Sequence, residues 1–286
     1  MNLLQLPEDW LARLSRYSIG TRSKVRGHHK GSSLSRRFGS SMDFSDFREY
    51  HPGDDVRHID WNVYARTERV YIKRFLDEQE MRVHIMVDAS KSMEGKWLFA
   101  RQLAYSLGSI VLMNDDKLSV SVGQGSQPPF RRKGKSAQKL FAHFFASLSK
   151  AGEQGFAQRA DFQPAKDSTV LFVLSDALEP LDDWQLFFSR AARYSKDIRF
   201  LHISEQQERE PRFTGDLRLI DRESADAFNV TMTAQTMREY SRQHQEHLAG
   251  LQTLCSRYGV HYLPVHAEDG VQQILLHQMA KQKWIQ

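Results

Sequence analysis

The chain has 286 residues, of which 40% are hydrophobic and 11% aromatic, so it can bury a substantial core and is not a disordered chain. Its 40 basic and 35 acidic residues give a formal net charge of +5. A single cysteine, Cys255, excludes an intrachain disulfide and a cysteine-based metal cluster. No apolar run approaches the roughly 18 residues of a spanning helix, and the acidic N-terminus lacks a signal-peptide pattern. We therefore expect a cytoplasmic protein without a transmembrane segment.

The excess positive charge lies in one stretch near the N-terminus. A short helix is expected after Pro7, because Trp10, Leu11 and Leu14 share a face. Residues 13–37 then carry eight bases and no acids, which leaves 32 bases against 35 acids elsewhere. This glycine- and serine-rich stretch predicts a mobile loop. It could bind nucleic acid or an anionic membrane surface, but it has few aromatics for base stacking, so we favour a loop that folds on an acidic partner.

From residue 82 onward, short apolar runs alternate with amphipathic segments. This alternation predicts a doubly wound α/β fold with a mostly parallel sheet and helices on both faces. We place a first domain at residues 1–80 and a second at 81–286. The expected strands are 82–88, 117–123, 168–176, 197–204 and 260–265, the expected helices are about 95–113, 136–149, 181–195, 234–258 and 269–281, and a hairpin is expected at 217–220 and 228–232.

An oxygen-rich motif follows the first of these strands. Asp88, Ser90 and Ser92 lie where the strand ends, and Asp176 ends a later strand in the same way. In doubly wound sheets, ligands bind at the carboxyl ends of the strands. Carboxylate and hydroxyl oxygens suit Mg²⁺ or Mn²⁺, and all four side chains could face one ion if the two strands are neighbours. The alternative is that Asp88 only caps a helix start, with both serines in the same role.

This motif resembles the metal-ion-dependent adhesion site of von Willebrand factor A domains. The resemblance implies a Mg²⁺ ion with an open coordination position that a partner's carboxylate fills. It also implies direct binding by Ser90 and Ser92, and binding by Asp88 and Asp176 directly or through water. The family's loop threonine is missing, because Ala160 stands about where it is expected and Ser136 is only a weak substitute by position. The resemblance therefore predicts weak metal binding or none.

A charged segment, residues 47–75, precedes the first strand. Its distinctive residues are Arg48, Tyr50, Pro52, Gly53, Asp54, Asp55, Arg57, Ile59, Asp60, Trp61, Ala65 and Arg66. With the upstream basic stretch and residues 219–224, these residues resemble the signature of the bacterial family called "domain of unknown function 58". Members are commonly encoded beside MoxR-type AAA+ ATPases, which implies such an ATPase and a client protein as partners.

Two interpretations of this signature remain open. In the first, Arg48, Arg57 and Arg66 pair with the acids of the segment in a buried clamp that joins residues 1–80 to the sheet. Because Arg57 lies among apolar neighbours in the sequence, this interpretation expects it to be buried. In the second, the segment is a docking surface for the ATPase or its client.

Other chemistries are less well supported. His244 and His247 are three residues apart, but no third ligand with sensible spacing follows, so a histidine zinc site is not expected. Asp88 could instead serve as the nucleophile of a metal-dependent phosphotransfer enzyme, but Ser90 stands where such enzymes usually place a second acid. The sequence thus favours a non-enzymatic adaptor, with a phosphotransfer enzyme or a scaffold with an empty metal site as alternatives.

Overall fold

The computed structural model describes residues 4, 6–21, 36–37, 44–75, 77–78, 81–123, 128–148, 155–211, 215–220 and 227–286. The chain forms two compact units, which we call the sheet unit (Met1–Thr21 with Met81–Gln286) and the signature unit (Arg22–Glu80). One division between the two units falls between residues 80 and 81. The first 21 residues, however, belong with the sheet and not with the signature segment.

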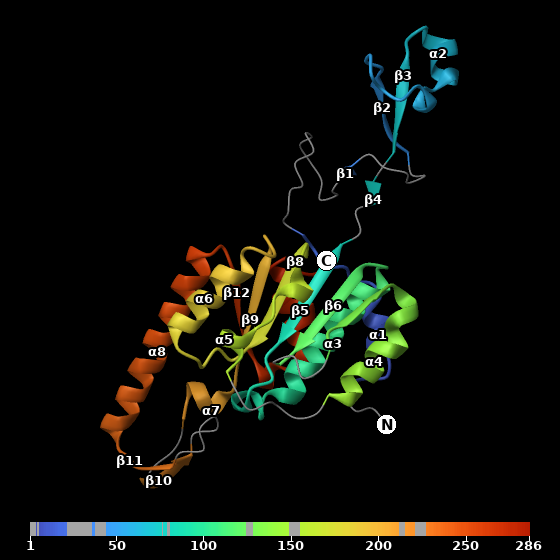
Figure 1. Ribbon diagram of the computed structural model, residues 1–286. Helices are drawn as coiled ribbons and strands as arrows, with labels where there is room; N and C mark the ends of the chain where they lie inside the picture. Colours follow the sequence, from blue (N-terminus) through green and yellow to red (C-terminus); the bar gives the residue numbers. More distant parts are fainter. Residues whose placement is uncertain are drawn as a thin grey trace. The chain divides into compact units, whose positions relative to one another are not determined.

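A six-stranded sheet forms the centre of the sheet unit (Figure 1). Its neighbours are parallel except for the last pair, which is antiparallel, so the expected α/β fold with a mostly parallel sheet is confirmed. The edge strand of that last pair was not predicted, because only its first residue is buried. In spatial order the strands are β12 (His261–His266), β9 (Ile198–Ser204), β8 (Val170–Ser175), β5 (Arg82–Val87), β6 (Lys117–Val122) and β7 (Phe130–Lys133).

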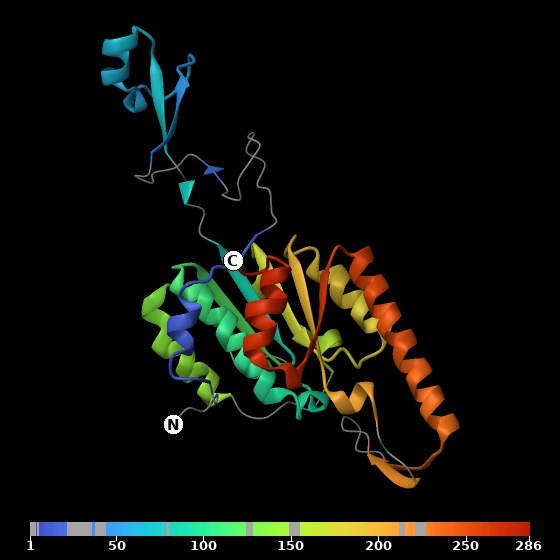
Figure 2. The same cartoon turned by 180° about the vertical axis from the view of Figure 1, so that it is seen from behind.

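Helices cover both faces of this sheet (Figures 1 and 2). One face carries the helices α1 (Trp10–Leu14), α3 (Trp97–Met113), α4 (Gln138–Ser147) and α9 (Gly270–Gln273), with the π-helix η6 (Ile274–Met279). The other face carries α5 (Phe156–Arg159), α6 (Leu181–Ala191) and α8 (Ala234–Arg257).

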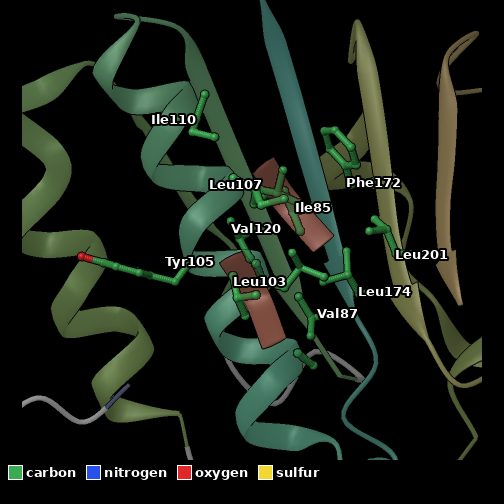
Figure 3. Close-up of a cluster of buried hydrophobic side chains, with 14 of the residues drawn as sticks. Ile85, Val87, Leu103, Tyr105, Leu107, Ile110, Val120, Phe172, Leu174 and Leu201 are labelled. Atoms are coloured by element: carbon green, nitrogen blue, oxygen red, sulfur yellow. The ribbon is translucent and has the colours of Figure 1, made fainter. Parts of the chain in front are cut away.

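The two helical layers bury alternate residues of the same strands. Ile85 and Val87 of β5 pack with Leu103 and Leu107 of α3, as Figure 3 shows, whereas Met86 packs in the opposite core. Burial on both faces explains why β5 and β8 are nearly continuous apolar runs. Cys255 is a buried core residue of the second layer.

The N-terminal segment is anchored in the sheet unit at two places. The indole nitrogen of Trp10 donates a hydrogen bond of 2.8 Å to Ser106 Oγ on α3. Backbone groups of Ser18 and Gln286 exchange hydrogen bonds of 2.8 and 3.0 Å. These contacts explain why α1 is part of the sheet unit.

The expected hairpin is present as β10 (Gly215–Ile220) and β11 (Ala227–Met232), and it leads into α8. The short helix α7 (Gln206–Arg209) follows β9. None of the helices in the described part of the chain combines the length and apolarity that a membrane crossing requires.

The signature unit is built on an antiparallel pair, β2 (Phe44–Glu49) and β3 (Tyr71–Phe75). Between these strands lie a 3-10 turn, η1 (Val56–His58), and the helix α2 (Trp61–Thr67). A second short pair joins β1 (Arg36–Arg37) to β4 (Asp77–Glu78). Most of the predicted mobile basic loop, residues 22–35, lies outside the described residues.

Candidate functional site

Asp88 and Asp176 follow two neighbouring strands, so the structure brings them to one edge of the sheet. β5 pairs with β8 in parallel, and the backbone N–H of Asp88 donates to the carbonyl of Leu174 at 2.8 Å. The condition that the two strands be neighbours, which the sequence left open, is therefore met.

Asp88 has no exposed surface, and both of its carboxylate oxygens accept hydrogen bonds. Oδ1 accepts from the backbone N–H of Ser90 at 2.8 Å, and Oδ2 accepts from the Ser175 hydroxyl at 2.6 Å. Burial, reinforced by the charges of Asp176 and Glu179, raises the pKa of Asp88 to about 8. Asp88 thus fixes the loop after β5 and links it to the end of β8. Ser90, the N-cap residue of the 3-10 turn that follows, makes no side-chain capping bond, so the capping role considered for the serines is not seen there.

Ser90 and Ser92 flank the start of the 3-10 turn η2 (Lys91–Met93). Their Oγ atoms are 2.9 Å apart. Adjacent oxygens around an octahedral Mg²⁺ ion, with bonds of about 2.0–2.1 Å, are separated by about the same distance. The two hydroxyls form a hydrogen bond with each other, and hydroxyl oxygens are among the donor types that Mg²⁺ accepts.

A buried lysine, Lys96, pairs with the acidic residues Asp176 and Glu208 beside this site. Lys96 Nζ lies 2.9 Å from Asp176 Oδ2 and also pairs with Glu208, and the Lys96 and Asp176 side chains are each only 1% exposed. Burial alone would lower the pKa of Lys96, but Asp176 and Glu208 outweigh it and raise that pKa above its ordinary value. Sequence reasoning missed Lys96, because its partners are 80 and 112 residues away and no local pattern marks the contact.

Three further side chains hold the loop after β8. Glu179 accepts from the backbone N–H groups of Phe156 and Ala157 at 2.5 and 3.0 Å, and burial raises its pKa. His202 Nε2 donates to the Asp176 carbonyl at 2.9 Å, and His247 Nε2 donates to the Ala177 carbonyl at 2.7 Å. Over the described ranges, no group of three histidine, cysteine or acidic residues could hold a metal ion.

Neither candidate for the missing loop threonine reaches the site. Ala160 is 2% exposed in the core beneath α6, and its carbonyl accepts from Arg190 at 2.9 Å. Ser136 follows β7, whose end at Lys133 pairs with the beginning of β6 at Lys117, so it lies at the opposite edge of the sheet from Asp88. The suggestion that Ser136 replaces the missing threonine is therefore wrong, because the sheet topology puts it at the other edge.

In the signature unit, Asp54 organises the first turn. It accepts a hydrogen bond of 2.6 Å from Arg48 and one of 2.8 Å from the backbone N–H of His51. Gly53 adopts φ of +106°, a conformation that favours glycine. Tyr50 continues the pairing beyond β2 by donating its N–H to the carbonyl of Val70 at 2.9 Å.

Asp60 caps α2 and is the buried acid of the signature. Its Oδ1 accepts from the N–H groups of Asn62 and Val63 at 2.9 and 3.2 Å, and its Oδ2 lies 3.1 Å from Lys73 Nζ. The pairing with Lys73 is the main reason why the pKa of Asp60 is lowered. This acid therefore pairs with a lysine of β3, not with the arginines that the sequence suggested.

The expectation of a buried Arg57 is wrong. Arg57 pairs with Asp55 at 2.8 Å, but its side chain is 85% exposed and that of Asp55 is 40% exposed. Trp61 is 63% exposed and packs edge-on against the exposed Tyr64, with ring centroids 6.1 Å apart. Arg66 is also exposed. Apolar neighbours in the sequence did not indicate burial, because Val56 and Trp61 themselves lie on the surface of this unit.

This chain is similar to several known proteins. "Uncharacterized protein Rv1480" of Mycobacterium tuberculosis and "Uncharacterized protein Mb1516" of Mycobacterium bovis are each 25% identical over 227 residues, which cover 74% of this chain and 71% of theirs. Among solved structures, a conserved hypothetical protein BatB from Bacteroides thetaiotaomicron covers 70% of this chain and 98% of its own, at 14% identity and a TM-score of 0.34. An aerotolerance-related membrane protein from Bacteroides fragilis, with multiple mutations to serines, covers 63% of this chain and 98% of its own, at 14% identity and a TM-score of 0.32.

The TM-scores are too low to carry an argument about this chain. The family comparison is stronger, because one family model matches residues 46–250, which include η1, α2 and β3 of the signature unit and the strand ends that carry Asp88 and Asp176. The chain belongs to the family described as "Protein of unknown function DUF58".

Proposed function

We propose that this chain is a non-enzymatic adaptor that grips a carboxylate of a client protein at the Asp88–Asp176 edge and works with a MoxR-type AAA+ ATPase. The observation that carries the proposal is the state of Asp88, which is fully buried and accepts hydrogen bonds at both oxygens. Such a carboxylate holds a loop in place and is poorly placed to attack a substrate. The ATPase and the client come from the family resemblance.

The oxygen donors at the Asp88–Asp176 edge of the sheet support a role for Mg²⁺ or Mn²⁺ in binding the client's carboxylate. Ser90 and Ser92 would hold the ion, with Asp88 and Asp176 contributing directly or through water. When bound, the ion would supply a Lewis-acidic position for the client's carboxylate. With no threonine ligand found at either candidate position, we expect weak binding of the ion.

The exposed side of the signature unit supports an ATPase-docking role. Arg57, Trp61 and Tyr64 leave large parts of their side chains in solvent. Asp54 and Asp60 instead accept hydrogen bonds from backbone N–H groups of the same unit. Tryptophan, tyrosine and arginine are the residues that most often dominate binding at protein interfaces. We therefore propose that these three residues form the docking surface. We also propose that the protein acts in the cytoplasm.

The test is direct binding between the purified chain and the purified MoxR-type ATPase of the same cell, by calorimetry. We expect Trp61→Ala to weaken binding by about 10-fold or more, as loss of an interface tryptophan typically does. Phe228→Ala is the matched control, because Phe228 is 59% exposed on the hairpin strand β11 and should not matter. No binding by the wild type, or equal binding by Trp61→Ala, would contradict the docking proposal.

A second experiment separates the adaptor from an enzyme. Purified chain with Mg²⁺ should not turn over phosphate esters or nucleotides. A turnover that is abolished in Asp88→Asn would overturn the adaptor and favour the phosphotransfer enzyme.

A further inference from the structure

We propose that Lys96 is a resident cation that competes with divalent metal ions for Asp176, so that the edge binds Mg²⁺ or Mn²⁺ weakly until the ammonium moves wholly to Glu208. This inference rests on the proposed metal site and concerns what limits its affinity.

The first argument is the position of the ammonium. Lys96 precedes α3, in the same loop that carries Ser90 and Ser92, and its side chain reaches back to Asp176 Oδ2 at 2.9 Å. Both side chains are almost completely buried. A charge held there is screened little by water, so it strongly affects any second cation that approaches Asp176.

The second argument is that Glu208 provides an alternative anchor. Glu208 Oε1 pairs with Lys96, while its Oε2 accepts the backbone N–H of Glu205 at 2.9 Å and so forms a capping box on α7. This capping box fixes the Glu208 carboxylate in place, so it can retain the ammonium if Asp176 releases it.

The third argument is charge balance. Asp176 already has a positive partner, so a divalent ion gains less from this acid than from an unpaired one. Removing one member of a buried pair leaves the other charge uncompensated. Without the Lys96 ammonium, Asp176 and Glu208 would both lack a cation, and a divalent ion would restore the balance. A purely structural ion pair predicts only a loss of stability and no gain in metal affinity.

The experiment measures Mn²⁺ binding to the full-length chain by electron paramagnetic resonance of the free ion. Lys96→Met keeps the aliphatic stem and removes the charge. We expect it to bind Mn²⁺ about 10- to 1000-fold more tightly than the wild type, the factor by which a neighbouring opposite charge alters proton binding to a carboxylate. Lys91→Met, in the turn between the two serines, is the matched control and should change the affinity far less.

A second variant covers the case in which Lys96→Met fails to fold. Glu208→Gln keeps an acceptor for the capping box but removes the alternative anchor, so Lys96 stays on Asp176 and Mn²⁺ binding should become no tighter. Thermal melts with and without Mn²⁺ complete the set, because an ion that binds the folded state raises its melting temperature.

Several outcomes overturn the inference. They are equal Mn²⁺ affinity in wild type and Lys96→Met, an equal gain in Lys91→Met, and tighter binding in Glu208→Gln. If the wild type binds tightly and Asp88→Ala abolishes that binding, the proposed metal site stands and the role of Lys96 falls. If neither the wild type nor Lys96→Met binds Mn²⁺, both the metal site and the role of Lys96 fall, whereas docking of the ATPase is tested separately.

Discussion

Two charged residues of the signature differ in what their side chains contact. Arg57 makes a two-point contact with Asp55, but water surrounds both groups and screens their attraction. Asp60 is buried, caps α2 and pairs with Lys73 of β3. We therefore expect Arg57→Ala to leave the melting temperature of the signature unit nearly unchanged. Asp60→Ala should lower it by about 4–8 °C, the shift typical for loss of one helix cap in a unit of this size.

Thermal unfolding of the two full-length variants, followed through the indole N–H resonance of Trp61, measures the difference, because this signal separates Trp61 from the other four tryptophans of the chain. Arg57→Lys should behave as Arg57→Ala does, because little of the pair's geometry is protected from solvent. A strongly destabilised Arg57→Ala would restore the buried-clamp interpretation that the structure contradicts.

His84 on β5 gives the sheet unit a specific sensitivity to acid. It is 1% exposed, its Nε2 lies 3.2 Å from Ser121 Oγ, and burial, with a smaller effect of Arg131, lowers its pKa to about 3. The unfolded chain takes up a proton near pH 6.5, whereas the folded chain does so only near pH 3. The contribution of the neutral His84 imidazole to the free energy of unfolding is therefore fully present above pH 6.5. It decreases as the pH falls toward 3, by at most about 1.4 kcal/mol per pH unit.

The measurement is urea unfolding of wild type and His84→Leu between pH 7 and 4. The variant should lose less stability over this range than the wild type. His143→Leu, at an exposed position on α4, should follow the wild-type pH dependence. Parallel curves for wild type and His84→Leu would show that His84 is not the acid-sensitive group.

At the scale of the element, α3 and α4 approach each other through Gly108. A Cβ at this position would overlap the ring of Phe141 and lie 2.9 Å from Leu118 Cδ2 on β6. Alanine usually stabilises a helix interior relative to glycine, but here the overlap outweighs that preference. We expect Gly108→Ala to destabilise the sheet unit by about 1–3 kcal/mol in chemical denaturation.

Gly250→Ala on α8 is the comparison. Its new Cβ would meet only a side-chain methyl of Leu181, a partly buried residue that can turn aside. That variant should be close to neutral. If Gly108→Ala were equally neutral, the packing of α3 on α4 would be looser than the structure indicates.

The elements that the sequence predicts well are those with a complete local signal. The apolar runs of β5 and β8 end in acids, so the sequence placed Asp88 and Asp176 at strand ends, whereas only the folded chain shows that these strands are neighbours. The strand β7 lacks such a signal, because most of its residues face solvent. The predicted set of site residues was incomplete for a different reason. Lys96 and Glu208 are 112 residues apart in the sequence, and only the folded chain brings them into contact.

At the scale of the molecule, the signature unit is an insertion between two segments that both belong to the sheet unit. Residues 1–21 end in a backbone pairing with the C-terminus, through Ile19 and Ile285, and residue 81 leads directly into the central strand β5. Each unit has its own internal contacts, so a substitution in one unit should change mainly the stability of that unit. Two tryptophans on the two units allow this independence to be tested.

Trp10 and Trp61 are a matched pair for that test. Trp10 is 2% exposed, packs in the core with Leu14 and bonds to Ser106, whereas Trp61 is 63% exposed on the signature unit. Trp10→Ala should destabilise the sheet unit by about 3–5 kcal/mol, the usual result of truncating a buried aromatic side chain. Trp61→Ala should leave that stability unchanged. Urea unfolding followed by far-ultraviolet circular dichroism, which reports mainly the helices of the sheet unit, measures both variants. A neutral Trp10→Ala would mean that the N-terminal helix contributes little to the sheet unit, and a destabilised Trp61→Ala would mean that the two units unfold together.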